Sequence, residues 1–115
     1  MAIQQWSENI VLAELQDDPQ FTDDLSALME LVENRPQTDV VLNLRGVTFL
    51  NSSNIAKLLK LRKQVIITND RHIRLCEIST NVWGVFLVTG LDKIFEFSND
   101  VASALASLQL NNKEK

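Results

Sequence analysis

The chain has 115 residues, of which 45% are hydrophobic and 23% are charged. This length suits one ordinary domain, and the composition is that of a folded globular protein rather than a disordered chain. A formal net charge of −4 argues against a nucleic-acid-binding domain, which normally carries a strongly basic surface.

The first third of the chain predicts a short hairpin followed by a helix. Residues 10–15 form an apolar run bounded by turn-forming residues, and residues 3–6 fit a short strand that pairs with it. Apolar residues then recur at helical spacings of three and four: Phe21, Leu25, Leu28, Met29 and Val32. Thr22 is the expected N-cap of this helix, and residues 34–36 (Asn-Arg-Pro) end it.

The middle of the chain predicts a buried strand and a long helix. Residues 39–44 contain a continuous apolar run, which is typical of a strand covered on both faces. Residues 51–54 (Asn-Ser-Ser-Asn) then provide helix-capping side chains. Residues 65–68 have the propensity of a strand, but the apolar periodicity favours a helix that continues to about Asn69.

The last third predicts two more strand-helix pairs. Residues 72–78 read as a strand, after which Ser79 or Thr80 caps a helix that ends at Gly90. Residues 94–97 form a short last strand. A terminal helix follows, for which Ser98 or Asn99 is the expected cap.

This order of elements predicts an α/β fold. Strands that alternate with helices indicate a mostly parallel sheet of four to five strands with about four helices. No linker interrupts the pattern, so we expect one domain over residues 1–110. Residues 111–115 are polar and are expected to form a disordered tail.

The side chains that enzymes use are scarce. The chain has one His, one Cys and no Tyr; His72 starts a predicted strand, and Cys76 lies in an apolar run that favours a small buried side chain. Asp17 and Asp18 lack the further oxygen ligands that a cation site usually recruits from a recognisable loop, and residues 17–24 fit a solvated loop as well as a partner surface. We therefore expect no catalysis, no metal and no cofactor. We also expect a cytoplasmic location, because no signal peptide or membrane-spanning run is present.

One segment stands out as a candidate site. Residues 42–50 (Leu-Asn-Leu-Arg-Gly-Val-Thr-Phe-Leu) place an apolar turn after the buried strand, and Asn51-Ser52-Ser53-Asn54 then opens the helix. Helix capping alone explains these side chains, since Asn and Ser accept hydrogen bonds from the first free amides.

The same residues resemble the STAS domains of bacterial anti-sigma factor antagonists. That family has an apolar-Asp-apolar strand, an apolar turn, and Asp-Ser-Ser-Gly or Asp-Ser-Thr-Gly at a helix start. Residues 42–44 match the strand, residues 47–50 the turn and residues 51–54 the helix start. Residues 78–79 and 90–95 extend the resemblance, which covers most of the chain from about Ile10 to Leu108.

The resemblance implies a non-enzymatic module that works by partner switching. In the family, the Ser after the Asp is phosphorylated by a kinase-like anti-sigma factor, and the unmodified form binds that partner. Carried over by motif, the phosphoacceptor is Ser52, with Ser53 as its neighbour. The expected partner-binding residues are Asn51, Ser52, Ser53, Asn54, Lys57 and Lys60, and the expected partner is a protein rather than a nucleic acid or a membrane.

Three amides depart from the family pattern. Asn51 and Asn43 replace Asp, and Asn54 replaces Gly, where its side chain could obstruct a partner. The alternative hypothesis is therefore a constitutive scaffold, or a subunit of a stress-signalling or transporter assembly, without phosphorylation. The sequence leaves the partner, the modification of either serine and the oligomeric state open.

Overall fold

The computed structural model describes residues 2–113, and the side chains of residues 2–110. One sheet has the strand order β1-β2-β3-β4-β5, in which β1 is antiparallel to β2 and the other pairs are parallel. The strands are β1 (Ile3–Gln5), β2 (Ile10–Gln16), β3 (Asp39–Gly46), β4 (Ile73–Cys76) and β5 (Glu96–Ser98). The main helices are α1 (Gln20–Asn34), α2 (Ser52–Arg62), α3 (Thr80–Thr89) and α4 (Val101–Lys113). The predicted α/β fold, with its mostly parallel sheet and four helices, is confirmed.

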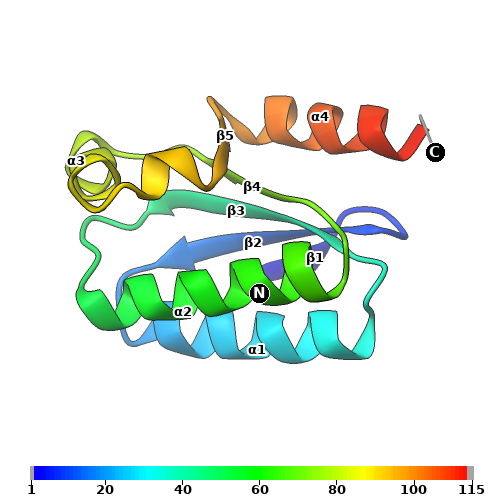
Figure 1. Ribbon diagram of the computed structural model, residues 1–115, viewed down its shortest axis with the longest axis horizontal. Helices are drawn as coiled ribbons and strands as arrows, with labels where there is room; N and C mark the ends of the chain where they lie inside the picture. The colour runs from blue at the N-terminus through cyan, green and yellow to red at the C-terminus, as the bar shows by residue number, and fades with distance from the viewer. Residues whose placement is uncertain (1, 114–115) are drawn as a thin grey trace.

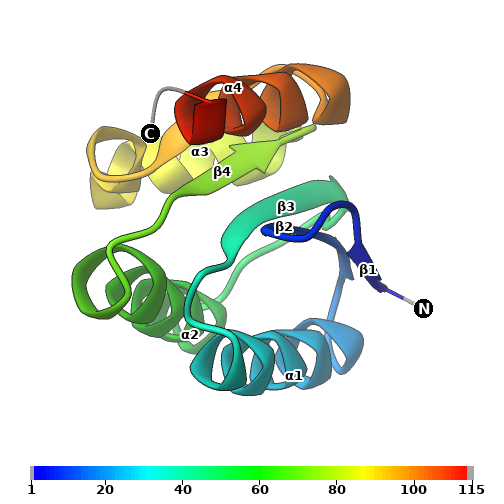
Figure 2. The same cartoon turned by 90° about the vertical axis from the view of Figure 1, so that its right-hand side faces the viewer.

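Helices cover both faces of the sheet. α1 and α2 lie side by side under one face, and α4 lies over the other (Figure 1). The turned view shows the sheet between these two layers (Figure 2). α3 packs at the β5 edge of the sheet through ring contacts of Trp83 and Phe86 with Phe97, and its Val82 and Phe86 join the core between the sheet and α1 and α2. None of the helices within residues 2–113 is long and apolar enough to cross a membrane.

The central strand, β3, is buried on both faces. Val40, Leu42 and Leu44 point into the larger core, against α1 and α2. Val41 points the other way and packs in a smaller core with Leu105 and other residues of α4. The continuous apolar run is therefore what the two-sided cover requires, as the sequence predicted.

Residues 65–68 are helical, as their periodicity predicted. α2 continues into the π-helix η1 (Lys63–Thr68), where the Asn69 N–H donates to the carbonyl oxygen of Gln64 over 3.0 Å. Val65 is fully buried in the larger core, and this packing outweighs the strand propensity of the segment. The chain then turns at Asp70, whose φ of 55° lies in the left-handed region that Asp tolerates.

The predicted hairpin and the predicted ends of α3 are confirmed. β1 and β2 form the expected antiparallel hairpin. The Ser79 hydroxyl oxygen accepts a hydrogen bond from the Val82 N–H over 3.3 Å, so Ser79 caps α3. Gly90 ends α3 with a φ of 77°, a conformation that glycine adopts without steric cost.

The expected caps of α1 and α4 were wrong. α1 begins at Gln20, and the Asp18 carboxylate accepts a hydrogen bond from the Thr22 N–H over 3.0 Å, so Asp18 takes the capping role expected of Thr22. At α4, the Asp100 carboxylate accepts a hydrogen bond from the Ser103 N–H over 2.7 Å, in place of Ser98 or Asn99. In both cases a carboxylate lies nearer the free amides of the first turn.

The last strand and the tail also differ from expectation. β5 comprises Glu96–Ser98 rather than residues 94–97, because the 3₁₀ turn η2 (Leu91–Lys93) carries the chain further before pairing begins. α4 continues to Lys113, into the segment that we expected to be disordered. Residues 114–115 of that expected tail lie outside the described residues.

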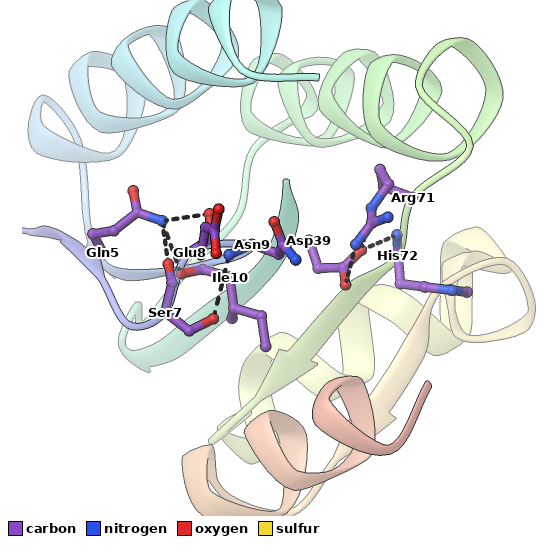
Figure 3. A network of polar contacts seen from close by, with 8 residues as sticks. All are labelled: Gln5, Ser7, Glu8, Asn9, Ile10, Asp39, Arg71 and His72. Atoms are coloured by element: carbon purple, nitrogen blue, oxygen red, sulfur yellow. Dashed lines mark hydrogen bonds and ion pairs between the residues drawn. The ribbon is translucent and has the colours of Figure 1, made fainter. Parts of the chain in front are cut away.

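A buried ion pair ties the amino ends of β3 and β4 together (Figure 3). The Asp39 side chain is fully buried, and its two oxygens accept hydrogen bonds from Nε and Nη2 of Arg71, each over 3.0 Å. The same carboxylate accepts the His72 N–H over 2.9 Å. Because a buried carboxylate is costly unless it is paired and hydrogen-bonded, these contacts fix where β3 and β4 start.

We expect Asp39→Asn to lower the free energy of unfolding by about 3 kcal/mol, because a neutral amide replaces the buried carboxylate that accepts hydrogen bonds from Arg71 and from the His72 N–H. Urea denaturation measures the change as a shift in the midpoint of unfolding, while the dependence of the unfolding free energy on urea concentration stays the same. Glu30→Gln, at an exposed position on α1, is the matched control and should change stability by less than about 0.5 kcal/mol. Equal effects of the two substitutions would contradict a stabilising role for the pair.

Candidate functional site

The candidate site lies at the carboxyl edge of the parallel strands. β2 and β3 both end there, and α1 and α2 begin there, at the left of Figure 1. Polar groups at strand ends and helix starts come together at such an edge, which is where open α/β sheets usually bind their ligands. The motif at residues 51–54 follows β3 after the turn of residues 47–50 and lies at this edge.

The turn after β3 combines buried and exposed apolar side chains. Val47 and Leu50 are buried, whereas Phe49 is 63% exposed. Gly46 lets the turn start close to β2, because a Cβ atom there would lie 2.9 Å from the carbonyl oxygen of Leu15. The turn is therefore anchored from inside, and it presents one aromatic ring to the surroundings.

Two amides build the start of α2. Asn51 is the N-cap, and its Oδ1 accepts a hydrogen bond from the Asn54 N–H over 2.8 Å. In return, Oδ1 of Asn54 accepts a hydrogen bond from the Asn51 N–H over 3.0 Å. This is a reciprocal capping box in which Asn takes the place that Glu or Gln usually fills. The capping box itself therefore contains no charged side chain.

The loop between β2 and α1 clamps this helix start. Nδ2 of Asn54 donates a hydrogen bond to Asp18 over 2.8 Å, and the same carboxylate accepts the Thr22 hydroxyl over 2.7 Å. Asp17 accepts hydrogen bonds from the Thr48 hydroxyl over 2.6 Å and from the Thr48 N–H over 2.9 Å. Both carboxylates therefore bind the motif segment of their own chain.

These hydrogen bonds lower the pKa of both carboxyl groups. The Thr48 hydroxyl is the main cause for the pKa of Asp17, and the Asn54 amide is the main cause for the pKa of Asp18. Each donor stabilises the charged form of the carboxylate that it contacts. The nearby ammonium group of Lys57 lowers the pKa of Asp18 further.

The two serines of the motif are exposed but have different surroundings. The Ser53 oxygen accepts a hydrogen bond from Nζ of Lys57 over 2.7 Å, one turn further along α2. The Ser52 hydroxyl makes no hydrogen bond to any residue that the structure describes. Ser52 is therefore the more available of the two hydroxyls.

Five of the six expected contact residues reach the surface. Asn51, Ser52, Ser53 and Lys60 are exposed, and Lys57 is half-buried. Asn54 is only 3% exposed, and its side chain points toward Asp18 rather than outward. Asn54 therefore holds the loop between β2 and α1, and its place among the partner-binding residues stays a prediction.

Asn43, the remaining amide that departs from the family pattern, is half-buried. Its Oδ1 accepts a hydrogen bond from the Arg45 N–H over 2.9 Å, just before β3 ends. This side chain organises the end of its own strand.

Four residues of this edge were not identified as part of the site from the sequence. Asp17 and Asp18 were expected as a solvated loop, a partner surface or a cation site, and Thr48 and Phe49 were expected in the turn of the motif but without individual roles. The sequence did contain one usable signal: parallel strands place their carboxyl ends together, so an acidic pair just after β2 must lie near the turn after β3.

The remaining candidates for chemistry have structural surroundings. Cys76 is buried, its Sγ donates to the carbonyl oxygen of Leu42 over 3.6 Å, and burial raises its pKa to about 12. At such a pKa the reactive thiolate is scarce near neutral pH. Within residues 2–113, no group of three or more His, Cys, Asp or Glu side chains is placed to hold a metal ion.

Comparison with known proteins places this architecture in a family. The family model described as STAS domain matches residues 9–104. Among solved structures, an anti-sigma-factor antagonist (STAS) domain protein from Planctomyces limnophilus has a TM-score of 0.78 at 19% identity, over 93% of this chain and 97% of that one. An RsbS protein from Moorella thermoacetica has a TM-score of 0.80 at 11% identity, over 96% of each chain. A sulfate transporter family protein from Wolinella succinogenes has a TM-score of 0.73 at 16% identity, over 93% and 90%.

We expect Asn54→Ala to lower the free energy of unfolding by about 1 to 2 kcal/mol, because it removes half of the capping box and leaves Asp18 without its amide partner. Chemical denaturation measures the loss. Ser53→Ala, one residue away but exposed, serves as the control and should stay within about 0.5 kcal/mol of the unchanged protein. A loss for Ser53→Ala as large as that for Asn54→Ala would contradict the clamp.

The clamp should persist to low pH. Folding lowers the pKa of Asp17 and Asp18 below the ordinary value of 3.8. Their contribution to stability is therefore complete above pH 3.8, and it is lost as the pH falls through the pKa values of the folded protein. The amide resonances of Thr22 and Thr48 should therefore titrate with midpoints below 3.8 in an NMR pH series. Midpoints above that value would contradict these hydrogen bonds. Asp18→Asn should abolish the titration at Thr22 alone.

Proposed function

This chain belongs to the STAS domain family, and we propose that it is a non-enzymatic module that binds a protein partner through the start of α2. The observation that carries the proposal is the Ser52 hydroxyl, which is exposed and makes no hydrogen bond to the described residues, at a helix start held by the capping box of Asn51 and Asn54. A rigid frame around one available hydroxyl suits recognition by another protein.

The proposed contact surface combines hydroxyls, cations and one aromatic ring. We call it the serine face and define it by Asn51, Ser52, Ser53, Lys57 and Lys60. Phe49 lies at its edge, and the 63% exposure of this ring supports a role as an apolar anchor in a pocket of the partner. Lys57 and Lys60 favour a partner with acidic groups around that pocket.

The proposed regulation is phosphorylation of Ser52 by a kinase-like anti-sigma factor. A phosphate adds about two negative charges, and the free amides at the helix start and the helix dipole stabilise it there. The same charge disfavours an acidic partner surface through repulsion. Modification would therefore release the partner without unfolding this domain. Such a switch in transcription regulation would operate in the cytoplasm.

A second candidate is a constitutive scaffold or a subunit of a larger assembly, including a transporter assembly. The observation that favours it is Asn51, because the uncharged cap removes the carboxylate that the family pattern places beside the phosphoacceptor. The structural likeness to the Wolinella protein extends to the fold alone and is compatible with this candidate.

The test is to incubate the purified chain with a kinase-like anti-sigma factor of the same organism and Mg-ATP, and to map the modified residue by mass spectrometry. We expect one phosphate on Ser52. Ser52→Ala should abolish the modification, whereas Ser53→Ala should retain it. Stable binding of the two proteins without modification of Ser52 would exclude switching and leave the scaffold.

The binding surface itself is tested by calorimetry with the unmodified chain. Phe49→Ala should weaken binding by about tenfold or more, as expected for a buried aromatic anchor. Ile67→Ala is a matched control, because Ile67 is also 63% exposed but lies in η1, two helical turns beyond Lys60. Equal affinities for the unchanged chain and Phe49→Ala would overturn the proposed contact surface.

A further inference from the structure

A hollow on the same edge of the sheet has no role in the function proposed above. It lies where β4 and β5 end and where α3 and α4 begin. Its volume is about 270 Å³, and it is lined by Ile78, Trp83, Phe97, Ser98 and Asn99. Drug-sized ligands usually occupy cavities of about 300 to 1,000 Å³, so this one suits a molecule with one or two fused rings.

The walls of this pocket favour a flat ring. Trp83 and Phe97 meet edge to face, with ring centroids 5.1 Å apart and planes at 87°. Two rings at a right angle form a corner that can hold a third ring. The third ring can stack on the face of one side chain and meet the other side chain edge to face. Both arrangements are favourable for aromatic pairs.

The rim of the pocket offers unused hydrogen-bonding groups. The Ser98 hydroxyl and the Asn99 side-chain amide make no hydrogen bond to any described residue. The Glu77 N–H donates to the carbonyl oxygen of Asn99 over 3.3 Å, which holds the two strand ends together. Glu77 does so with a φ of 58°, a strained conformation of the kind that clusters at ligand sites.

The charges around the pocket disfavour an anion. Glu77 precedes the lining residue Ile78 in the chain, and Asp100 follows Asn99. Both carboxylates are close enough to act electrostatically on Cys76 at the end of β4. Arg74, the cation of that strand, is paired with Glu96 over 2.9 Å. Ser79 and Asp100 already accept N–H groups at the starts of α3 and α4, so the two carboxylates would repel a negatively charged ligand, whereas a cation would also gain from the aromatic faces.

We propose that this pocket binds a small planar nitrogen heterocycle, no larger than two fused rings and without negative charge. The heterocycle would lie in the corner between Trp83 and Phe97, and its nitrogen groups would hydrogen-bond to Ser98 and Asn99. The proposal does not depend on Ser52 or on any protein partner.

The test uses two probes with the same ring system and opposite charge, 4-aminoquinoline and quinoline-4-carboxylate, added to the isotope-labelled full chain at low salt. We expect 4-aminoquinoline to shift the Trp83 indole N–H and the amides of residues 78 and 97–99 in a saturable way. Quinoline-4-carboxylate should bind at least about tenfold more weakly than 4-aminoquinoline. Cross-peaks between the probe and the Trp83 and Phe97 ring protons would place the probe directly.

Two variants sharpen the test. Trp83→Ala should weaken binding of 4-aminoquinoline at least about tenfold, while Val88→Ala, 88% exposed on the same helix, should leave it unchanged. The absence of saturable shifts in the unchanged chain, shifts confined to other residues, or tighter binding of the carboxylate would each overturn the proposal. The cross-peaks in the unchanged chain decide the matter even if Trp83→Ala does not fold.

Discussion

The burial of β3 on both faces is the constraint on which the rest of the structure depends. Its side chains pack against α1 and α2 on one side and against α4 on the other, so only its ends can carry polar groups that meet water. The Asp39 pair with Arg71 occupies the amino end. The turn that leads into Asn51 occupies the carboxyl end, and the exposed serines follow from that position.

The candidate site is rigid because its support comes from a distant part of the chain. Asp17 and Asp18 contact Thr48 and Asn54, residues 31 and 36 positions away in sequence. These hydrogen bonds join the loop after β2 to the turn and the helix start that precede and open α2. Asn54, where the family has glycine, therefore adds a cross-link to the helix start and leaves the approach to Ser52 open.

The sequence predicted the elements better than it predicted their contacts. Periodicity was sufficient for residues 65–68, because burial of Val65 obeys the helical spacing that precedes it. The capping role expected of Thr22 was wrong because the competing acceptor, Asp18, lies two residues before α1 and accepts the Thr22 N–H from there. The inward direction of Asn54 and the exposure of Phe49 depend on how β2 and β3 are paired, so neither could be derived from residue types alone.

The hydrogen bond between Lys57 and Ser53 makes two adjacent serines chemically different. An ammonium group withdraws electron density from the oxygen that it contacts, and so reduces the nucleophilicity of that hydroxyl toward an incoming phosphoryl group. The oxygen of Ser52 keeps both lone pairs. For the phosphorylation proposed above, this difference between the two serines favours Ser52 as the acceptor.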